Sequence, residues 1–589
     1  MAFLIAGFGP QDKVPGAFGE VVYGVSGQSA ASAPLLLLLC GLALAAGTIV
    51  QDTQIVQAFG KTDFDTYAGA GGELATMGYD AIDTDPTVPV FMGSPVIPGG
   101  AVAANATLAI TGSTATVGGT VSLRAAGKNV PLQIVVGDTP TAFATRAAAT
   151  INGAFSGRFP LSASASVGNV TLSWKTPGVR SSQAFVFIDT SQSGSTGLSA
   201  TISGAAWVTG TVYPMNSYVI PTVSNGFYYK ATAITGTGTS GASQPTWPTT
   251  IGTTVIDNAG ANQITWTCWG VLDGTGNQYG VSLGGGTGLE TYTNILSTIA
   301  TSQYDRIALA CNDSTSLAAW KTAMDAQMLA PVNIMQMAVV GFNGTLTAAQ
   351  TLACTTLNDQ IFQLVWCLNS ETSPWRLAAQ VAAKRAGRES IDPDAPYNYE
   401  TLAFAAPMAV KADWPSHATL VSALNNGVTP LTTTDGSSLK IVRSITSHCL
   451  LSGNADYSTL DTGQASVPQF VFKDLRLYWT TQVAPNNPRV SPDPPVTLRN
   501  PPQGVMYPYL WSSLVYNRLL GYAAGNLSGP VPVGTQTQQQ PQVPPIIINP
   551  VPPTSSYDYV GNRIMIQIPI TPAPNNAQCG ISVRQTSPS

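Results

Sequence analysis

The residue types that carry out enzyme chemistry are few in this sequence, and they stand outside known catalytic motifs. Only two histidines occur, His417 and His448, and neither lies in a nucleophile, zinc or phosphate-binding motif. Asp392 and Asp394 flank a proline after a predicted helix, which favours helix termination over acid/base chemistry. The run Gly284–Gly288 resembles a phosphate cradle but lacks the Lys-Ser/Thr of a P-loop, so a tight turn is expected. We therefore predict no catalytic residue, no cofactor and no metal site.

The cysteines indicate the redox state in which the chain folds. None of them stands in the CxxC spacing of zinc and redox motifs. An odd number of cysteines in a chain of this length predicts reduced, mostly buried thiols, which fits folding in a cytoplasm. The seven cysteines are Cys40, Cys268, Cys311, Cys354, Cys367, Cys449 and Cys579.

An aromatic-rich segment at 206–271 is the one place where ligand binding is a candidate. Exposed aromatic rings offer flat apolar faces on which sugar rings stack. The alternative is structural, because a small β-domain also needs aromatic side chains to fill its own core. Asp257 is the only acid in the segment, whereas a glycosidase needs two carboxylates. The candidate glycan-stacking residues are Trp207, Tyr229, Trp247 and Trp266.

Composition excludes several classes of protein and favours a subunit of an assembly. Of the 589 residues 44% are hydrophobic but only 9% are charged, against roughly 25% in an ordinary soluble domain. Such a surface is poorly solvated unless neighbouring subunits cover it. An extracellular Thr/Ser/Gly-rich β-protein is the alternative. A net charge of −5 without a basic cluster argues against direct nucleic-acid binding.

Periodicity predicts an α/β core made of a mostly parallel sheet flanked by helices, with inserted α+β and β-rich domains and extended terminal arms. The apolar run that follows Pro34 is shorter than the roughly 20 residues of a membrane span, so we expect a strand buried on both faces and no membrane insertion. Ser316–Met328 is a predicted helix with an apolar face, and Pro374–Gly387 is a predicted Ala-rich helix with Arg376, Lys384 and Arg385 on its outer side.

The predicted units follow one another along the chain. They are an N-terminal arm (1–30), the first part of the core (31–100), an α+β module (101–205), the aromatic all-β module (206–271), the α/β core (272–410), a C-terminal domain (411–533), a Gln/Pro linker (534–554) and a C-terminal arm strand (555–589).

Alternating apolar residues in both arms predict strands that pair with a neighbouring copy of the chain. A strand beyond a proline-rich tether has no sheet of its own, so it is expected to add to the sheet edge of another subunit. The alternative is a strand that folds back on its own domain. The predicted inter-subunit strand residues are Val21, Tyr23 and Val25 in the N-terminal arm and Ile564, Ile566, Ile568 and Ile570 in the C-terminal arm.

The order of many short strings resembles the tail sheath protein of contractile-tailed bacteriophages, in particular the Mu-like family. The strings are Gly71–Met77, Gly137–Pro140, Gly284–Gly288, Tyr304–Ala308, Asp392–Pro396, Val442–Thr446 and Tyr457–Asp461. The aromatic module at 206–271 and the long Gln/Pro tract depart from the family pattern.

The resemblance implies a non-enzymatic structural subunit of a virion tail. Such a subunit is assembled in the bacterial host cytoplasm and polymerises with copies of itself as stacked rings or a helix. Its other partners would be the inner tail tube protein, the baseplate and the tail terminator. Contraction of the polymer would drive the tube through the host envelope for genome ejection. A glycan-binding adhesin or tail-fibre-type protein that uses the aromatic module is the alternative.

Overall fold

The computed structural model describes most of residues 34–570, and every structural statement below concerns the described part. The segments outside it are 1–33, 191, 193–196, 204–206, 214–217, 224, 226, 272–277, 284–285, 330–331, 369, 407–412, 457–458, 487–488, 495–503, 524–546, 548–549, 559–562 and 571–589. The N-terminal arm residues Val21, Tyr23 and Val25 therefore lie outside the described residues, as does most of the Gln/Pro tract.

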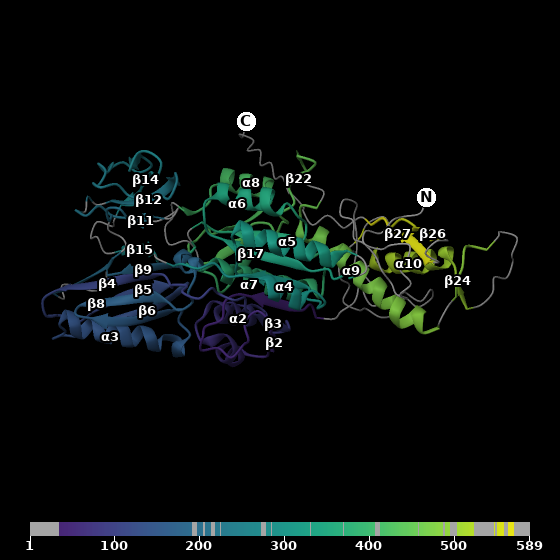
Figure 1. Cartoon of the computed structure of the whole chain (residues 1–589), viewed down its shortest axis with the longest axis horizontal. Helices are drawn as coiled ribbons and strands as arrows, with labels where there is room; N and C mark the ends of the chain where they lie inside the picture. The colour runs from purple at the N-terminus through teal and green to yellow at the C-terminus, as the bar shows by residue number, and fades with distance from the viewer. Residues whose placement is uncertain are drawn as a thin grey trace, which may run out of the picture.

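The largest element is a nine-stranded mixed sheet (Figure 1). Strands β20, β18, β17, β16, β1 and β3 run parallel, and antiparallel pairs close both edges. In sheet order the strands are β19 (Glu400–Leu402), β21 (Leu439–Ile441), β20 (Val428–Thr432), β18 (Phe362–Trp366), β17 (Met337–Phe342), β16 (Arg306–Leu309), β1 (Leu37–Cys40), β3 (Val90–Gly93) and β2 (Ile55–Ala58). β1 is fully buried between β16 and β3, which confirms the predicted buried strand.

Helices cover both faces of this sheet, so the predicted α/β core is present. α2 (Glu73–Thr84) and α7 (Pro374–Glu389) lie on one face, and α4 (Thr293–Ile299), α5 (Ser314–Met328), α6 (Leu346–Thr351) and α8 (His417–Asn425) contribute to the core on the other (Figure 1). Successive side chains of β1 pack alternately into the apolar clusters on the two faces of the sheet. Leu37 and Leu39 pack with α2 and α7, whereas Leu38 and Cys40 pack with α4 and α5.

The prediction that the arginines of α7 point outward is wrong. Arg376 and Arg385 are 3% and 1% exposed, and only Lys384 is half-buried. The reason is that α7 is enclosed on all sides, by the main sheet, by α2 and by the α+β module. Arg376 is neutralised by Asp80, which is distant in sequence, and Arg385 by Glu389 of the same helix.

The α+β module consists of two four-stranded antiparallel sheets and the helix α3 (Pro140–Gly153), whose N-cap Thr139 accepts a hydrogen bond from Ala142 N at 3.2 Å. One sheet contains β10 (Leu198–Ser203), β4 (Asn105–Gly112), β8 (Asn169–Trp174) and β7 (Leu161–Ser166). The other contains β15 (Gln278–Ser282), β9 (Phe185–Asp189), β5 (Gly119–Ala125) and β6 (Lys128–Ile134). Since β15 follows the aromatic segment in sequence and pairs with β9, the aromatic module is inserted within the α+β module.

The aromatic module is a four-stranded antiparallel sheet of β11 (Tyr218–Val219), β12 (Phe227–Ile234), β14 (Ile264–Val271) and β13 (Thr254–Asp257). At the other end of the molecule, α9 (Thr462–Tyr478) leads out of the core into a C-terminal lobe that contains α10 (Pro508–Ala523) and a β-hairpin (Figure 1). Among the described helices, none combines the length and the apolar character that crossing a membrane requires.

Candidate assembly site

The isoleucine-rich strand lies in the C-terminal lobe as one arm of a hairpin. β26 (Thr554–Asp558) pairs antiparallel with β27 (Arg563–Gln567), and Ile564 lies opposite Tyr557. Arg563 Nε donates to Asp558 Oδ2 at 2.8 Å and so closes the turn end of the hairpin. The strand therefore has a partner within its own chain, and its predicted addition to a neighbouring copy stays a prediction. Its pairing is the one that the alternative, a strand folding back on its own domain, describes.

The isoleucine side chains already have an apolar surface within the lobe. Ile564, Ile566, Ile568 and Ile570 are half-buried and pack against a core that includes Trp511, Val515 and Leu519 of α10. Ser512 Oγ of the same helix donates to Pro553 O at 2.6 Å and fixes the start of β26. The isoleucine face of the hairpin is thus docked on α10, and Met565 on the opposite face of β27 is buried as well.

The hairpin nevertheless has two outer edges that no other described strand covers. β26 and β27 pair only with each other in the described part of the chain, which leaves one side of each strand outside any ladder. An uncovered strand edge presents a row of backbone N–H and C=O groups, which is a template for another strand. A two-stranded sheet of this kind is the arrangement to which an extended segment adds in β-strand addition.

A buried ion pair holds α10 against α9. The carboxylate of Asp474 on α9 accepts hydrogen bonds from the Arg518 guanidinium and from the Tyr522 hydroxyl, both on α10. Burial works against the Arg518 charge, but the bond to Asp474 outweighs it and raises the pKa of Arg518 above its ordinary value. Asp474 is 1% exposed, so the two helices meet at a buried polar contact that fixes their relative orientation.

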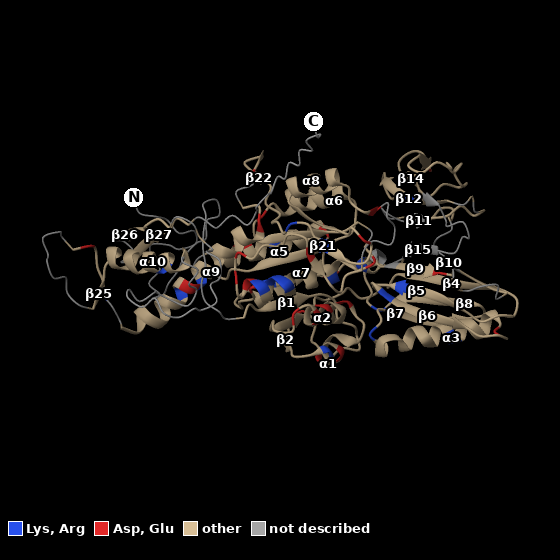
Figure 2. Ribbon diagram, turned by 180° about the vertical axis from the view of Figure 1, so that it is seen from behind, with Lys and Arg blue, Asp and Glu red and all other residues tan. Residues whose placement is uncertain are grey.

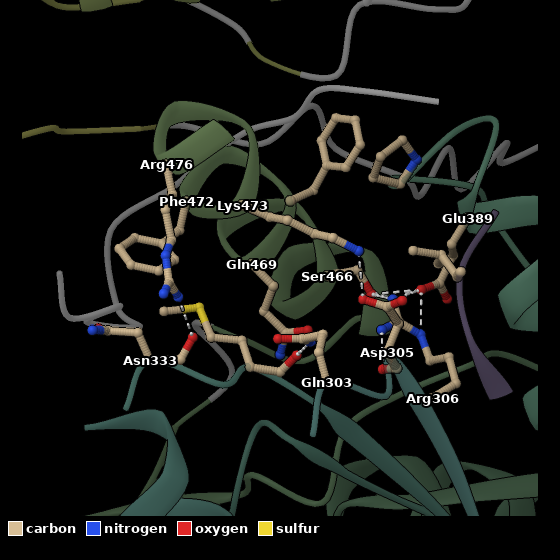
Figure 3. A pocket seen from close by; sticks show the side chains of 14 residues that line it. Gln303, Asp305, Arg306, Asn333, Glu389, Ser466, Gln469, Phe472, Lys473 and Arg476 are labelled. Atoms are coloured by element: carbon tan, nitrogen blue, oxygen red, sulfur yellow. Dashed lines mark hydrogen bonds and ion pairs between the residues drawn. The ribbon is translucent and has the colours of Figure 1, made fainter. Parts of the chain in front are cut away.

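A second set of polar contacts fastens α9 to the core (Figure 3). We call such a set of contacts between two parts of the chain a joint. A cavity of about 60 Å³ lies there, at the amino ends of β1, β16 and β17, with residues of α9 forming its other wall. Lys473 Nζ donates to Asp305 Oδ1 at 2.9 Å, and Arg306 Nη2 donates to Ser466 Oγ at 3.0 Å. These contacts link two residues of α9, Lys473 and Ser466, to the first residues of β16. The cavity therefore lies in the contact region between the core and α9, the helix that leads into the lobe.

The centre of that joint is a carboxylate shared by two arginines. Glu389 at the end of α7 accepts from Arg306 Nε at 2.9 Å and from Arg385 Nε at 2.6 Å. Burial alone would raise the pKa of Glu389, but the two guanidinium groups outweigh it and hold the pKa below its ordinary value. Arg385 also donates to Gln363 of β18 at 2.9 Å, so a single cluster ties α7, α9 and two strands together.

Similar buried ion pairs fasten the α+β module to the core. Arg180 donates to Glu73 of α2 at 2.8 Å and forms an ion pair with Glu290. Arg376 of α7 donates to both carboxylate oxygens of Asp80 at 2.8 Å and to the Ala126 carbonyl of the module. Figure 2 shows charged residues gathered around α7, α2 and the start of α9. Part of the sparse charge of the chain thus lies at the contacts between its parts.

The candidate glycan-stacking rings form the core of the aromatic module. Trp207, Tyr229 and Trp266 are 6%, 0% and 0% exposed, and Trp247 is half-buried with its ring centroid 4.3 Å from that of Tyr229. Asp257 is buried among them, where its carboxylate accepts from the indole N–H groups of Trp207 at 2.6 Å and Trp266 at 3.1 Å. With their faces packed on one another, these rings serve the structural role better than glycan binding.

A buried lysine joins the aromatic module to the C-terminal part of the core. Lys230 of β12 lies with its ammonium 3.8 Å from Asp413 and 4.1 Å from the ring centroid of Trp269. Trp269 Nε1 donates to the same carboxylate at 3.1 Å. Burial lowers the pKa of Lys230 to about 8, although Asp413 acts in the opposite direction.

The remaining candidates for chemistry occupy structural positions. His417 is the exposed first residue of α8, and His448 Nε2 lies 2.9 Å from Asp456 Oδ2. Asp392 Oδ1 accepts from Asp394 N at 3.1 Å just after the end of α7, in keeping with the predicted helix termination. In the described part of the Gly284–Gly288 run, Thr287 bridges to Val102, and no helix begins there because α4 starts at Thr293. No group of three or more metal-ligating side chains occurs among the described residues.

Two sets of residues with clear structural roles escaped the sequence-based predictions. Asp474 and Arg518 hold the C-terminal lobe together, and the signal was that Arg518 is the last charged residue before a long uncharged stretch. Cys354 and Cys449 form a disulfide, so the prediction of reduced thiols is wrong for this pair. Cysteines 95 residues apart carry no local signal that they meet.

No family model matches the chain, and no curated protein matches it. Among solved structures, the sheath tail protein from Desulfitobacterium hafniense is 11% identical, with 85% of this chain and 88% of that chain covered and a TM-score of 0.38. The sheath tail protein from Listeria innocua is 11% identical, with 77% and 78% covered and a TM-score of 0.34. Values this low do not assign the chain to a family.

Proposed function

We propose that this chain is a structural subunit of a bacteriophage contractile tail sheath, which polymerises with copies of itself around an inner tail tube. The observation that carries the proposal is the β26–β27 hairpin, which is a two-stranded sheet that no third described strand joins. A neighbouring copy would add an extended segment to one edge of this sheet, and the N-terminal arm strand at Val21, Tyr23 and Val25 is the candidate segment.

The energy of such a junction comes chiefly from the added ladder. The isoleucine faces already pack against α10, so their burial is not available to a neighbour a second time. Each backbone hydrogen bond of a new ladder contributes roughly 1 kcal/mol net. Several of these bonds give a junction of moderate strength, and repetition along a polymer makes the whole assembly stable.

Two further features support an assembled state. Charged residues make up only 9% of the chain, and buried ion pairs at the joints account for many of them. The outer surface is correspondingly poor in charge, which favours contact with other subunits. The order of short strings that resembles the Mu-like sheath family points the same way, and no step of this function requires a nucleotide or a metal.

In this proposal the subunit belongs to the virion tail and is assembled in the cytoplasm of the bacterial host. Its other partners are the inner tail tube protein, the baseplate and the tail terminator. Contraction converts an extended lattice of subunits into a more compact one, while the strand junctions between subunits stay attached. The contacts of α9 with the core and with α10 transmit the rotation of the core to the C-terminal lobe. That movement drives the tube through the host envelope.

The test is the assembly of the full chain against a chain that ends at residue 553 and so lacks the hairpin. We expect striated tubes in negative-stain micrographs and fast-sedimenting species from the full chain, and single subunits from the truncated one. Val223→Asp is the matched control, because Val223 is 83% exposed in the aromatic module, and this variant should assemble normally. Tubes formed by the truncated chain would refute the hairpin junction.

A further inference from the structure

The one disulfide among the described residues lies beside an exposed hairpin. Cys354 belongs to the helical turn Leu352–Leu357, and Cys449 directly precedes the strand β22 (Leu450–Leu451), with the two Cα atoms 5.8 Å apart. The other described cysteines, Cys40, Cys268, Cys311 and Cys367, are fully buried. Since Cys354 is half-buried, this pair is the one that a small solute can approach.

The hairpin beside the disulfide projects from the core and adds nothing to it. β22 and β23 (Asn454–Ala455) are joined by Ser452 and Gly453, both with positive φ, and Leu451 is 62% exposed (Figure 1). Asn358 fastens the base of the hairpin, since its Oδ1 accepts from the backbone N–H groups of Cys449 and Leu450 and its Nδ2 donates to Leu450 O. An element of this kind is held in place by its base alone, so the disulfide is a substantial part of what keeps it rigid.

The site also suits the two cysteines when they are reduced. Cys354 Sγ lies 3.1 Å from the carbonyl oxygen of Asn426, and Cys449 Sγ lies 3.7 Å from Asn358 Oδ1. Each sulfur therefore has an oxygen nearby that can accept from the S–H group of the reduced form. A site that accommodates the thiols as well as the disulfide allows the bond to open and close.

We propose that Cys354 and Cys449 are a reversible thiol–disulfide pair that sets the rigidity of the β22–β23 hairpin. In an oxidising medium the Cys354 thiolate attacks a low-molecular-weight disulfide such as oxidised glutathione, forming a mixed disulfide and releasing one glutathione thiolate. The Cys449 thiolate then attacks Cys354 Sγ, forms the protein disulfide and displaces the second glutathione thiolate. The two protons lost by the cysteines are taken up by the two glutathione molecules, and excess reduced glutathione runs the same steps backward.

The consequence is a hairpin whose mobility depends on the compartment. In a glutathione-reducing cytoplasm the pair is open, and hydrogen bonds alone, among them those of Asn358 and the His448–Asp456 contact, hold the base of the hairpin. Outside the cell the pair closes and adds a covalent constraint at the base. This inference does not depend on the proposed sheath function, because it concerns the single chain.

The experiment exposes the full-length chain to oxidised glutathione or to excess reduced glutathione. Iodoacetamide labelling with peptide mass spectrometry counts free thiols, and hydrogen exchange monitors the backbone of residues 450–456. We expect both cysteines to be labelled only in the reducing medium, where amide exchange in 450–456 should be at least about tenfold faster. Equal labelling in both media, or equal exchange in both, would overturn the proposal.

Two single variants separate the disulfide from general effects of reduction. Cys354→Ser should show the fast exchange of residues 450–456 in both media, because it cannot form the bond. Cys268→Ser removes a fully buried thiol of the aromatic module and should respond to the medium as the wild type does. Slow exchange in oxidised Cys354→Ser would show that the disulfide is not what stiffens the hairpin. The comparison of the wild type in the two media stands even if one variant folds poorly.

Discussion

The joint around α7 and the C-terminal lobe use polar groups in opposite ways. Around α7, several arginines and acids are removed from water and paired with one another, as in the Glu389 cluster and the Arg376–Asp80 pair. In the lobe the buried ion pair Arg518–Asp474 holds the helices, and the hairpin beyond it pairs with no other strand that the structure describes. The core thus pairs these charged groups with one another, whereas the lobe contains a hairpin that no third described strand joins.

This difference indicates what each region is built to do. A buried ion pair adds little stability over an apolar contact, but it penalises strongly any arrangement in which one partner is left alone. The joints around α7 therefore fix how the core, the α+β module and α9 lie relative to one another. The lobe packs the isoleucine residues of its hairpin on an apolar core, and no third strand of the described chain joins this hairpin, which is the arrangement on which the proposed junction rests.

The largest test of the comparison is removal of the shared carboxylate in the core. Glu389→Ala leaves Arg306 and Arg385 buried without their acid, so we expect the free energy of unfolding of the core to fall by about 3–5 kcal/mol. Glu400→Ala is the matched control, since Glu400 pairs with Lys384 and Arg388 from the same helix but its side chain is 32% exposed. That change should cost less than about 1 kcal/mol. Urea unfolding followed by tryptophan fluorescence measures both, and equal losses would contradict the distinction.

The sequence predicts the core better than it predicts the joints. The apolar run at β1 and the apolar face of α5 follow local periodicity, and the structure places Leu317, Trp320 and Met324 in the core as that periodicity predicts. The prediction for the arginines of α7 failed because helical periodicity places charged residues on the solvent side of a helix. The partner that reverses this rule for Arg376 is Asp80, which lies 296 residues away and carries no local mark.

The candidate site was predicted in part for the same reason. The isoleucine alternation identifies β27, but its partner β26 reads Thr-Ser-Ser-Tyr-Asp and shows no apolar alternation of its own. A polar strand is recognised only by the strand it pairs with. Likewise β15 joins the sheet of β9 across the whole aromatic insertion, which no pattern at either position indicates. Pairing between distant segments is therefore the part that single-sequence analysis could not supply.

An effect of intermediate size is expected at the contact between Lys230 of the aromatic module and Asp413. Because burial lowers the pKa of Lys230 to about 8, the folded chain releases this proton at a lower pH than the unfolded chain does. The unfolded state then binds more protons between about pH 8 and pH 10, so stability contributed by this group rises with pH over that window, by up to about 2 kcal/mol. Lys230→Met should lack this rise. Thermal unfolding of both proteins across the window, followed by tryptophan fluorescence, measures the difference, and parallel pH profiles would refute it.

The smallest expected effect comes from the same substitution, isoleucine to valine, made once in the core and once in the C-terminal lobe. Ile307→Val removes a methylene group from β16, where Ile307 is fully buried, and should cost about 0.5–1.5 kcal/mol. Ile566→Val makes the same change in the half-buried face of the hairpin and should cost less, below about 0.5 kcal/mol in the single chain.

If a neighbouring strand covers the edge of β27 in the assembly, its side chains will also cover the flank of Ile566, and the two costs should approach one another there. Unfolding of dispersed subunits measures the first difference and the stability of assembled tubes the second; a gap of the same size in both states would mean that the hairpin gains no cover on assembly.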